Sequence, residues 1–219
     1  MKILFYGDSV TDAGRMPDAD EIRNTTLGTG YVMLTASRLW LRDPTAYEIL
    51  NRGVSGNRSP DLYARVDKAV WASRPDLLSI LAGVNDVLHG IRKPVNGVPL
   101  ARFDRVYRMM LEETMEALPE TKIVLCEPFC LHGSMTDSVF AQISRVCEYA
   151  KAVEKMARDY GLYWLPLQDR LDAAAAKYGA ETILRDGIHP LIPGAAILAD
   201  AWMELFTNTI EPDMKGGKR

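Results

Sequence analysis

The sequence predicts a three-layer α/β/α domain built on a parallel sheet of about five strands. Short apolar runs alternate along the chain with longer amphipathic stretches, and the runs are apolar at successive positions. Strands buried on both faces and separated by helices are typical of a parallel sheet that helices cover on two sides. The 219 residues are enough for one full apolar core. We expect residues 1–210 to form this domain and residues 211–219 to form a flexible tail.

The first third of the chain begins with a strand. Residues 3–6 (ILFY) form the first apolar run. Residues 31–41 have apolar side chains spaced for one face of a helix, and residues 47–50 form a second short run that Asn51-Arg52-Gly53 ends. The order is therefore strand, helix, strand.

The middle of the chain continues this alternation. Residues 59–71 predict a helix with Pro60 at its first position, where the missing N–H costs nothing. Residues 77–81 (LLSIL) predict the third strand. Residues 103–118 predict a helix that ends before Pro119, and residues 122–126 (KIVLC) predict the fourth strand.

The last third repeats the pattern. Residues 138–160 predict a long helix that Gly161 ends, since glycine is the usual residue after a helix C-terminus. Residues 162–165 predict the fifth strand, and residues 167–178 and 194–206 predict two further helices. Together these elements predict a flavodoxin-like arrangement.

Composition excludes several classes of protein. Lys plus Arg is 26 and Asp plus Glu is 29, so the net charge is −3 and no nucleic-acid partner is expected. No apolar run reaches the roughly 18 residues of a membrane span, so no membrane partner is expected. Residues 3–6 are too few for a signal-peptide core, which favours the cytoplasm. The three cysteines lack disulfide or zinc spacing.

A serine follows the first predicted strand directly. Gly7 lets the chain turn sharply, and Ser9 can then point its hydroxyl away from the edge of the sheet, where ligands of open α/β sheets bind. Taken alone, these residues favour a simple turn in which Asp8 or Ser9 caps the next helix.

Polar groups also follow the second and third strands. Residues 51–57 (NRGVSGN) place two glycines three apart, which either permits tight backbone geometry or exposes N–H groups to a ligand. Residues 83–86 (GVND) are ordinary loop formers when taken alone. The chain contains neither of the usual glycine-rich nucleotide motifs, and no cofactor is expected.

One of the three histidines has a carboxylate at a suitable spacing. Asp186 precedes His189 by three residues, so it can accept the proton on Nδ1 and leave Nε2 free as a base. A serine hydroxyl is a weak nucleophile that needs such a base, which predicts that Ser9, His189 and Asp186 act together. Oxyanion donors are expected from the backbone of Ser9 and Gly56 and from the side chain of Asn85. No metal site is expected, because the histidines lack H-x-x-x-H spacing.

Four blocks in this order resemble the SGNH hydrolase superfamily, also called GDSL esterases and lipases. The blocks are Gly7-Asp8-Ser9, residues 51–57, residues 83–86 and residues 186–190, within a resemblance that spans residues 3–206. The resemblance implies that Ser9 is the nucleophile and that His189, oriented by Asp186, is the base. It also places Gly56 and Asn85 in an oxyanion hole.

A narrower resemblance is to intracellular bacterial acetylxylan esterases of this superfamily. It is carried by residues 27–32 (LGTGYV), 53–57 (GVSGN) and 83–87 (GVNDV). It implies a cytoplasmic serine esterase that removes short acyl groups, such as acetyl, from carbohydrate or other small esters. Val10 stands where the family's name has leucine, an apolar exchange that we expect to leave the chemistry intact.

Contacts with the substrate are expected from side chains near these blocks and after the fourth strand: Asp8, Tyr31, Asn57, Glu127 and Phe129. Two alternatives stay open. One is an enzyme of the same superfamily with longer acyl substrates, such as a lysophospholipase or thioesterase. The other is a non-catalytic ligand-binding module. A homo-oligomer is a further expectation, because many small enzymes are symmetric oligomers.

Overall fold

The structure, a computed structural model, describes residues 1–16 and 25–216. In this part of the chain five parallel strands form one sheet in the order β2-β1-β3-β4-β5. The strands are β1 (Lys2–Gly7), β2 (Glu48–Gly53), β3 (Leu77–Leu81), β4 (Lys122–Cys126) and β5 (Tyr163–Leu165). This is the strand order of flavodoxin-like folds, and the predicted fold class is confirmed.

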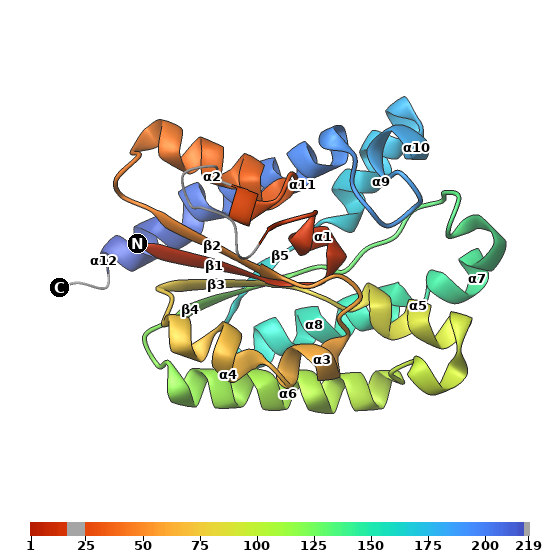
Figure 1. Cartoon of the computed structure of the whole chain (residues 1–219), viewed down its shortest axis with the longest axis horizontal. Coiled ribbons are helices and arrows are strands. Elements are labelled where there is room, and N and C mark those ends of the chain that lie inside the picture. The colour runs from red at the N-terminus through yellow and green to blue at the C-terminus, as the bar shows by residue number, and fades with distance from the viewer. Residues whose placement is uncertain (17–24, 217–219) are drawn as a thin grey trace.

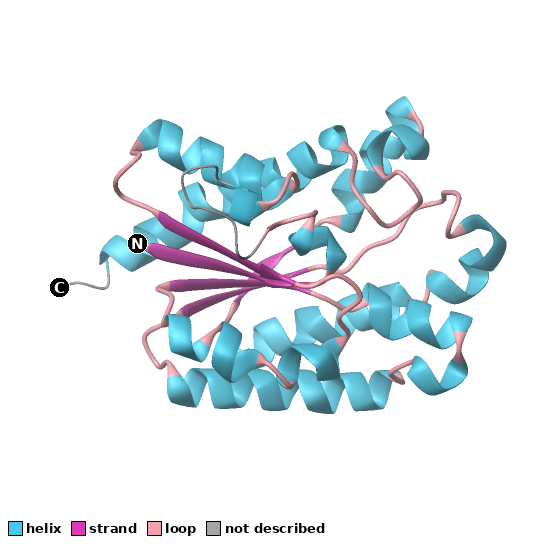
Figure 2. Ribbon diagram, viewed as in Figure 1, coloured by secondary structure: helices cyan, strands magenta, loops and turns pink. Residues whose placement is uncertain are grey.

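Helices cover both faces of the sheet and make the three layers visible in Figure 1 and Figure 2. One layer contains α2 (Tyr31–Arg42), α9 (Gln168–Tyr178) and α11 (Ile192–Leu205). The other contains α3 (Ser59–Tyr63), α4 (Val66–Ala69), α6 (Leu100–Ala117) and α8 (Val146–Tyr160). Shorter helices lie near the ends of the strands: α1 (Ser9–Asp12), α5 (Val84–Arg92), α7 (Phe140–Ile143) and α10 (Ala180–Ile183).

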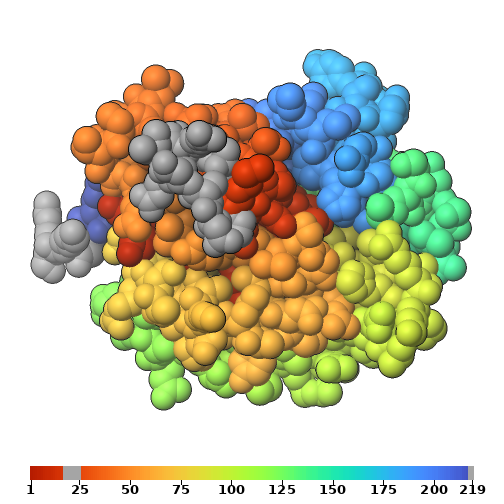
Figure 3. Space-filling model, in the orientation of Figure 1, coloured from red at the N-terminus to blue at the C-terminus, as the bar shows by residue number. Residues whose placement is uncertain are grey.

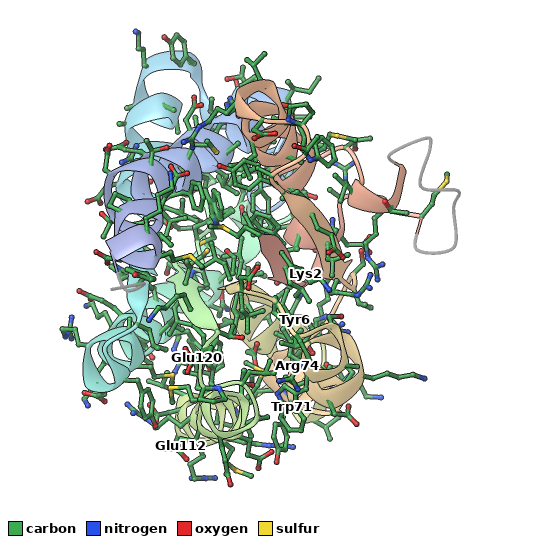
Figure 4. The ribbon with its side chains drawn as sticks, turned by 90° about the vertical axis from the view of Figure 1, so that its left-hand side faces the viewer. Lys2, Tyr6, Trp71, Arg74, Glu112 and Glu120 are labelled. Carbon is green, nitrogen blue, oxygen red and sulfur yellow. The ribbon has the colours of Figure 1, made fainter. Side chains whose placement is uncertain are left out.

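Strand β1 lies between β2 and β3 and is buried on both faces, because its side chains alternate between the two helical layers. Phe5 packs its ring against Tyr31 of α2 and Trp202 of α11, with ring centroids 5.7 and 5.2 Å away. Tyr6 points to the other layer, where its hydroxyl donates to the carbonyl of Leu62 at 2.6 Å. Figure 4 looks at the molecule from the end of the sheet that holds Lys2 and shows Tyr6 on the side of Trp71.

Two predicted helices are interrupted. The segment 59–71 forms α3 and α4 with a break at Arg65. The Arg65 guanidinium donates to Asn57 Oδ1 at 2.7 Å and to the carbonyl of Gly7 at 3.2 Å. The segment 138–160 begins with a 3-10 turn and is divided between α7 and α8.

One segment expected to be a loop is helical. Residues 84–86 open α5, which buries Val84, Val87 and Leu88 against the core. The apolar side chains of this helix follow the polar block directly, so the block itself becomes the first turn of the helix.

The segment after α11 continues through a π-helical turn (Phe206–Ile210) into α12 (Glu211–Gly216). Glu211 is buried and accepts hydrogen bonds from Arg42 at 2.6 Å and Lys215 at 2.9 Å. Residues 217–219 lie outside the described residues, and the division into a domain over 1–210 and a flexible tail over 211–219 stays a prediction. No helix in the described ranges is both long enough and apolar enough to cross a membrane.

Candidate active site

The candidate site lies at the carboxyl end of β1, where the strand order reverses. The chain passes from β1 to β2 on one side and then to β3 on the other, and such a switch point is where open α/β sheets bind ligands. Gly7 ends β1 in close contact with its neighbours: a Cβ there would lie 2.4 Å from the carbonyl of Leu81 and 2.5 Å from Thr11 Oγ1. Only glycine therefore fits at this point, because any side chain would collide with these two neighbours.

Asp8 sets the start of the following helix. Its carboxylate accepts a hydrogen bond from the Val10 amide at 3.0 Å and so caps α1. Ser9 becomes the first helical residue, and its side chain is half-buried at the edge of the sheet. The sequence suggested either a helix-capping turn or a serine that presents its hydroxyl to a ligand. Both occur, because Asp8 caps the helix and Ser9 lines the cleft.

Three predicted residues form a continuous chain of hydrogen bonds. Ser9 Oγ lies 2.8 Å from His189 Nε2, and His189 Nδ1 lies 2.8 Å from Asp186 Oδ2. Ser9 and His189 are 180 positions apart in the sequence. In Figure 3 the red N-terminal surface and the blue C-terminal surface are neighbours on one face of the molecule.

The loop that carries His189 is held from two sides. Leu184 and Pro190 form a bridge at its base, and the 130–136 segment supports its tip, where the Leu131 amide donates to the carbonyl of Gly187 at 2.8 Å. Gly187 has a φ of +93°, and a Cβ there would lie 2.2 Å from Thr136 Oγ1. The glycine of this block is thus required by close packing against the 130–136 segment.

Asp186 is kept charged by its neighbours. Burial alone would raise the pKa of its carboxyl, but the amide and ring of His189 and the amide of Ile188 donate to it and lower its pKa below the usual value. A carboxylate in this position selects the imidazole tautomer with hydrogen on Nδ1, which leaves Nε2 facing Ser9 as a proton acceptor.

The groups expected to donate to an oxyanion are the backbone amides of Ser9 and Gly56 and the side chain of Asn85. The side-chain amide of Asn85 donates to the carbonyl of Asn57 at 3.2 Å, which uses one of its two hydrogens. Gly56 has a φ of +82° in the loop after β2. Within residues 1–16 and 25–216, the backbone amides of Ser9 and Gly56 have no hydrogen-bond acceptor in the protein. All three groups thus keep a hydrogen available, and their role as donors to an oxyanion stays a prediction.

An open cleft of about 360 Å³ lies against the serine and the histidine. Its walls come from α1, the loop before α2, the loop after β2 and the 184–191 segment, and they include Ser9, Thr29, Tyr31, Ser55, Arg185 and His189. Clefts of roughly 300 to 1,000 Å³ are typical of small-molecule sites. Tyr31 lines this cleft, but it is 3% exposed and its hydroxyl is 3.1 Å from Thr11 Oγ1, so its contact with a substrate stays a prediction.

The other expected substrate contacts lie away from this cleft. Asp8 is fully buried as a helix cap, and Phe129 is buried in the core. Asn57 accepts from Arg65, and Glu127 accepts from the amides that open α9. Their contact with a substrate stays a prediction that burial and these hydrogen bonds do not support.

A buried carboxylate beneath the site was not expected. Asp86 accepts from the amide and hydroxyl of Ser59 at 3.0 and 2.6 Å. Burial raises the pKa of Asp86 to about 7 despite these donors, and burial likewise raises the pKa of Asp8 to about 7. The sequence signal was the acidic residue in the GVND block together with the serine before Pro60, but only packing shows that they meet.

The fold and the linked serine, histidine and aspartate define a serine esterase, a carboxylic ester hydrolase. The chain belongs to the GDSL-like Lipase/Acylhydrolase family, whose sequence profile matches residues 5–197. The resemblance to the SGNH superfamily is thereby confirmed.

Relatives cover almost the whole chain. An acetylxylan esterase of Geobacillus stearothermophilus is 31% identical over 209 residues, which are 92% of each chain. Its solved structure has a TM-score of 0.80 at 28% identity and covers 93% of this chain and 92% of that one. A GDSL-like protein of Parabacteroides merdae has a TM-score of 0.85 at 36% identity, covering 93% and 94%. Structures of the Geobacillus esterase include catalytic mutants in which a serine, an aspartate or a histidine is replaced by alanine.

Proposed function

We propose that this chain removes acetyl groups from acetylated oligosaccharides or other small esters through an acyl-enzyme on Ser9. The observation that carries the proposal is the pair of 2.8 Å contacts that link Ser9 Oγ to His189 and His189 to Asp186. A hydroxyl in contact with an imidazole whose other nitrogen is held by a carboxylate is the arrangement that activates serine as a nucleophile.

In the first half of the reaction, His189 Nε2 takes the proton of Ser9 Oγ as that oxygen attacks the ester carbonyl. The negative charge on the carbonyl oxygen is stabilised by the amides of Ser9 and Gly56 and by the second hydrogen of the Asn85 amide. His189 then gives its proton to the departing alcohol oxygen. The products of this step are the free alcohol and acetyl-Ser9.

In the second half, water replaces the alcohol. His189 takes a proton from the water as its oxygen attacks the acetyl carbonyl, and the same three donors stabilise the charge. The tetrahedral intermediate collapses, Ser9 regains the proton from His189, and acetic acid leaves. Asp186 stays ionised throughout and stabilises the protonated imidazole.

The cleft and the relatives support a small ester as the substrate. The walls of the cleft combine hydroxyl groups with the apolar Leu191, and the volume of about 360 Å³ suits a substrate of one or two sugar rings. The Geobacillus relative is named as an acetyl-xylooligosaccharide esterase. A homo-oligomer stays a prediction.

The test is acetate release from a panel of acetylated xylo-oligosaccharides, with Ser9→Ala as the control for background hydrolysis. We expect release by the unaltered chain and none above background by the variant. Release that is unaffected by Ser9→Ala would contradict the nucleophile assignment.

Acyl length is tested with p-nitrophenyl esters. The acetate should react faster than the octanoate if the site is an acetylesterase, since a small acyl pocket excludes long chains. Faster turnover of the octanoate would support the alternative with longer acyl substrates. Absence of covalent labelling by a serine-directed inhibitor would support a non-catalytic binding module.

A further inference from the structure

We propose that Arg185 selects esters whose non-reacting part carries a carboxylate, such as an acetylated oligosaccharide with a uronic acid residue. The proposal rests on the proposed function, because it names the class of substrate for the same site. It concerns how a substrate binds beside His189 and leaves the chemical step as described above.

Arg185 is held next to the imidazole by its backbone. Its amide donates to the carbonyl of His189 at 2.8 Å, and the preceding residue, Leu184, forms the bridge to Pro190 at the base of the loop. The Arg185 side chain leaves this fixed backbone into the cleft that Ser9 and His189 also line. It is 70% exposed, so a ligand in the cleft can reach it.

The guanidinium keeps its hydrogen-bonding capacity for a ligand. Its nearest carboxylate oxygen, Asp186 Oδ2, is 3.8 Å away, beyond hydrogen-bond distance. Both oxygens of Asp186 already accept from His189, one from the ring and one from the amide. Among the described residues, Arg185 has no other side-chain partner, and a guanidinium has five N–H donors.

Among the described residues of the cleft wall, Arg185 is the one with a permanent charge. The part of the cleft wall formed by described residues contains no aspartate or glutamate, and its other members are neutral residues such as Thr29, Ser55 and Leu191, apart from His189. The nearest carboxylate, Asp186, is buried and already bonded to His189, so the exposed positive charge of Arg185 favours an anionic ligand in the cleft. The planar fork of arginine matches a carboxylate in a bidentate manner, whereas a sugar hydroxyl offers only neutral hydrogen bonds.

Competitive inhibition measures this preference without requiring the sugar itself to be hydrolysed. The reporter is p-nitrophenyl acetate hydrolysis, and the two inhibitors are xylotriose and the same trisaccharide bearing one glucuronic acid. We expect the acidic sugar to bind about three- to tenfold more tightly at low salt. High salt should shrink this ratio, because the pair is exposed.

The variants separate the charge from a structural effect. Arg185→Ala and Arg185→Gln should both reduce the ratio of inhibition constants to about one, and Arg185→Lys should keep part of it. The matched control is Arg158→Ala on α8, which removes an arginine that is 63% exposed and lies outside the cleft wall. This control should leave the ratio and the basal activity unchanged.

Equal inhibition by the two sugars in the unaltered chain, or a ratio unchanged in both neutral variants, overturns the proposal for Arg185. Acetate release from neutral acetylated xylo-oligosaccharides tests the proposed function separately. Absence of that release together with a preserved inhibition ratio rejects the acetylesterase and keeps the anion preference. Acetate release combined with equal inhibition by the two sugars rejects the anion preference alone.

Discussion

Ser59 and Ser9 differ in how each is linked to an aspartate, and of these two only Ser9 is placed to react. Ser59 donates its hydroxyl directly to Asp86 at 2.6 Å, and both residues are 1% exposed. Ser9 contacts His189 at 2.8 Å, and the aspartate, Asp186, lies behind the imidazole. Ser9 is half-buried and lines a cleft.

The difference shows which features make a hydroxyl a nucleophile. A carboxylate alone is a poor acceptor for a hydroxyl proton, whereas an imidazole oriented by a carboxylate can take that proton and return it. Ser9 lines a cleft that a ligand could enter, whereas burial shields Ser59. The Ser9–His189 pair is thus suited to catalysis, and the Ser59–Asp86 pair is suited to holding α3 and α5 together.

The largest expected effect is on Ser9. Ser9→Ala removes the attacking oxygen, so kcat should fall by about 10⁴- to 10⁶-fold. The melting temperature should stay near that of the unaltered chain, which circular dichroism can check. Normal turnover by this variant would contradict the assignment of Ser9 as the nucleophile.

Asp186→Asn should have the next largest effect. The amide cannot hold the imidazole in the required tautomer, and kcat should fall by about 10³- to 10⁴-fold. Steady-state kinetics on p-nitrophenyl acetate measures the loss. A change of less than tenfold would mean that the ring of His189 is oriented without this carboxylate.

Asn85→Ala tests the proposed oxyanion donor. Loss of one preorganised donor should lower kcat by roughly 10²- to 10³-fold with KM little changed. A rise in KM at constant kcat would instead place Asn85 among groups that bind the substrate in its ground state.

Ser59→Ala tests the buried pair. The variant removes a hydroxyl donor from Asp86 and should lower the free energy of unfolding by about 1 to 3 kcal/mol, because a buried acceptor loses a partner. Urea unfolding measures this change, and kcat below the unfolding transition should stay close to that of the unaltered chain. A hundredfold loss of kcat at unchanged stability would show that Ser59 takes part in catalysis, which would contradict the structural role that we propose for it.

The smallest expected effect is a change in pH dependence. The folded pKa of Asp86 is about 7, above its unfolded value of roughly 4, so the folded state binds more protons between these values. This carboxyl therefore contributes stability that is present below about pH 4 and lost as the pH rises through about 7. Asp86→Asn removes that contribution.

The measurement is the free energy of unfolding of Asp86→Asn minus that of the unaltered chain, followed from pH 4 to pH 8 by urea unfolding. The difference should rise with pH up to about 7 and then level off. A constant difference across this range would mean that Asp86 is ionised in the folded state throughout.

Much of the fold and site could be predicted from local residue patterns. Apolar runs marked all five strands of the described chain, and the strands 77–81 and 122–126 have the predicted bounds. The GDS and DGIHP blocks pointed to Ser9 and His189 because a nucleophile and its base need specific residue types, with a carboxylate at a fixed spacing from the base. The helix at 84–92 was missed, since its polar first turn is typical of a loop.

The sequence by itself determined the order of strands and helices and pointed to the candidate catalytic residues, because side-chain type and hydrophobic period are local properties. Only the tertiary structure decided that residues 180 positions apart lie 2.8 Å from each other, that Asp8 is a buried cap, and that Asp86 meets Ser59. Burial and contact depend on how distant elements pack, and packing cannot be read from the spacing within any one segment.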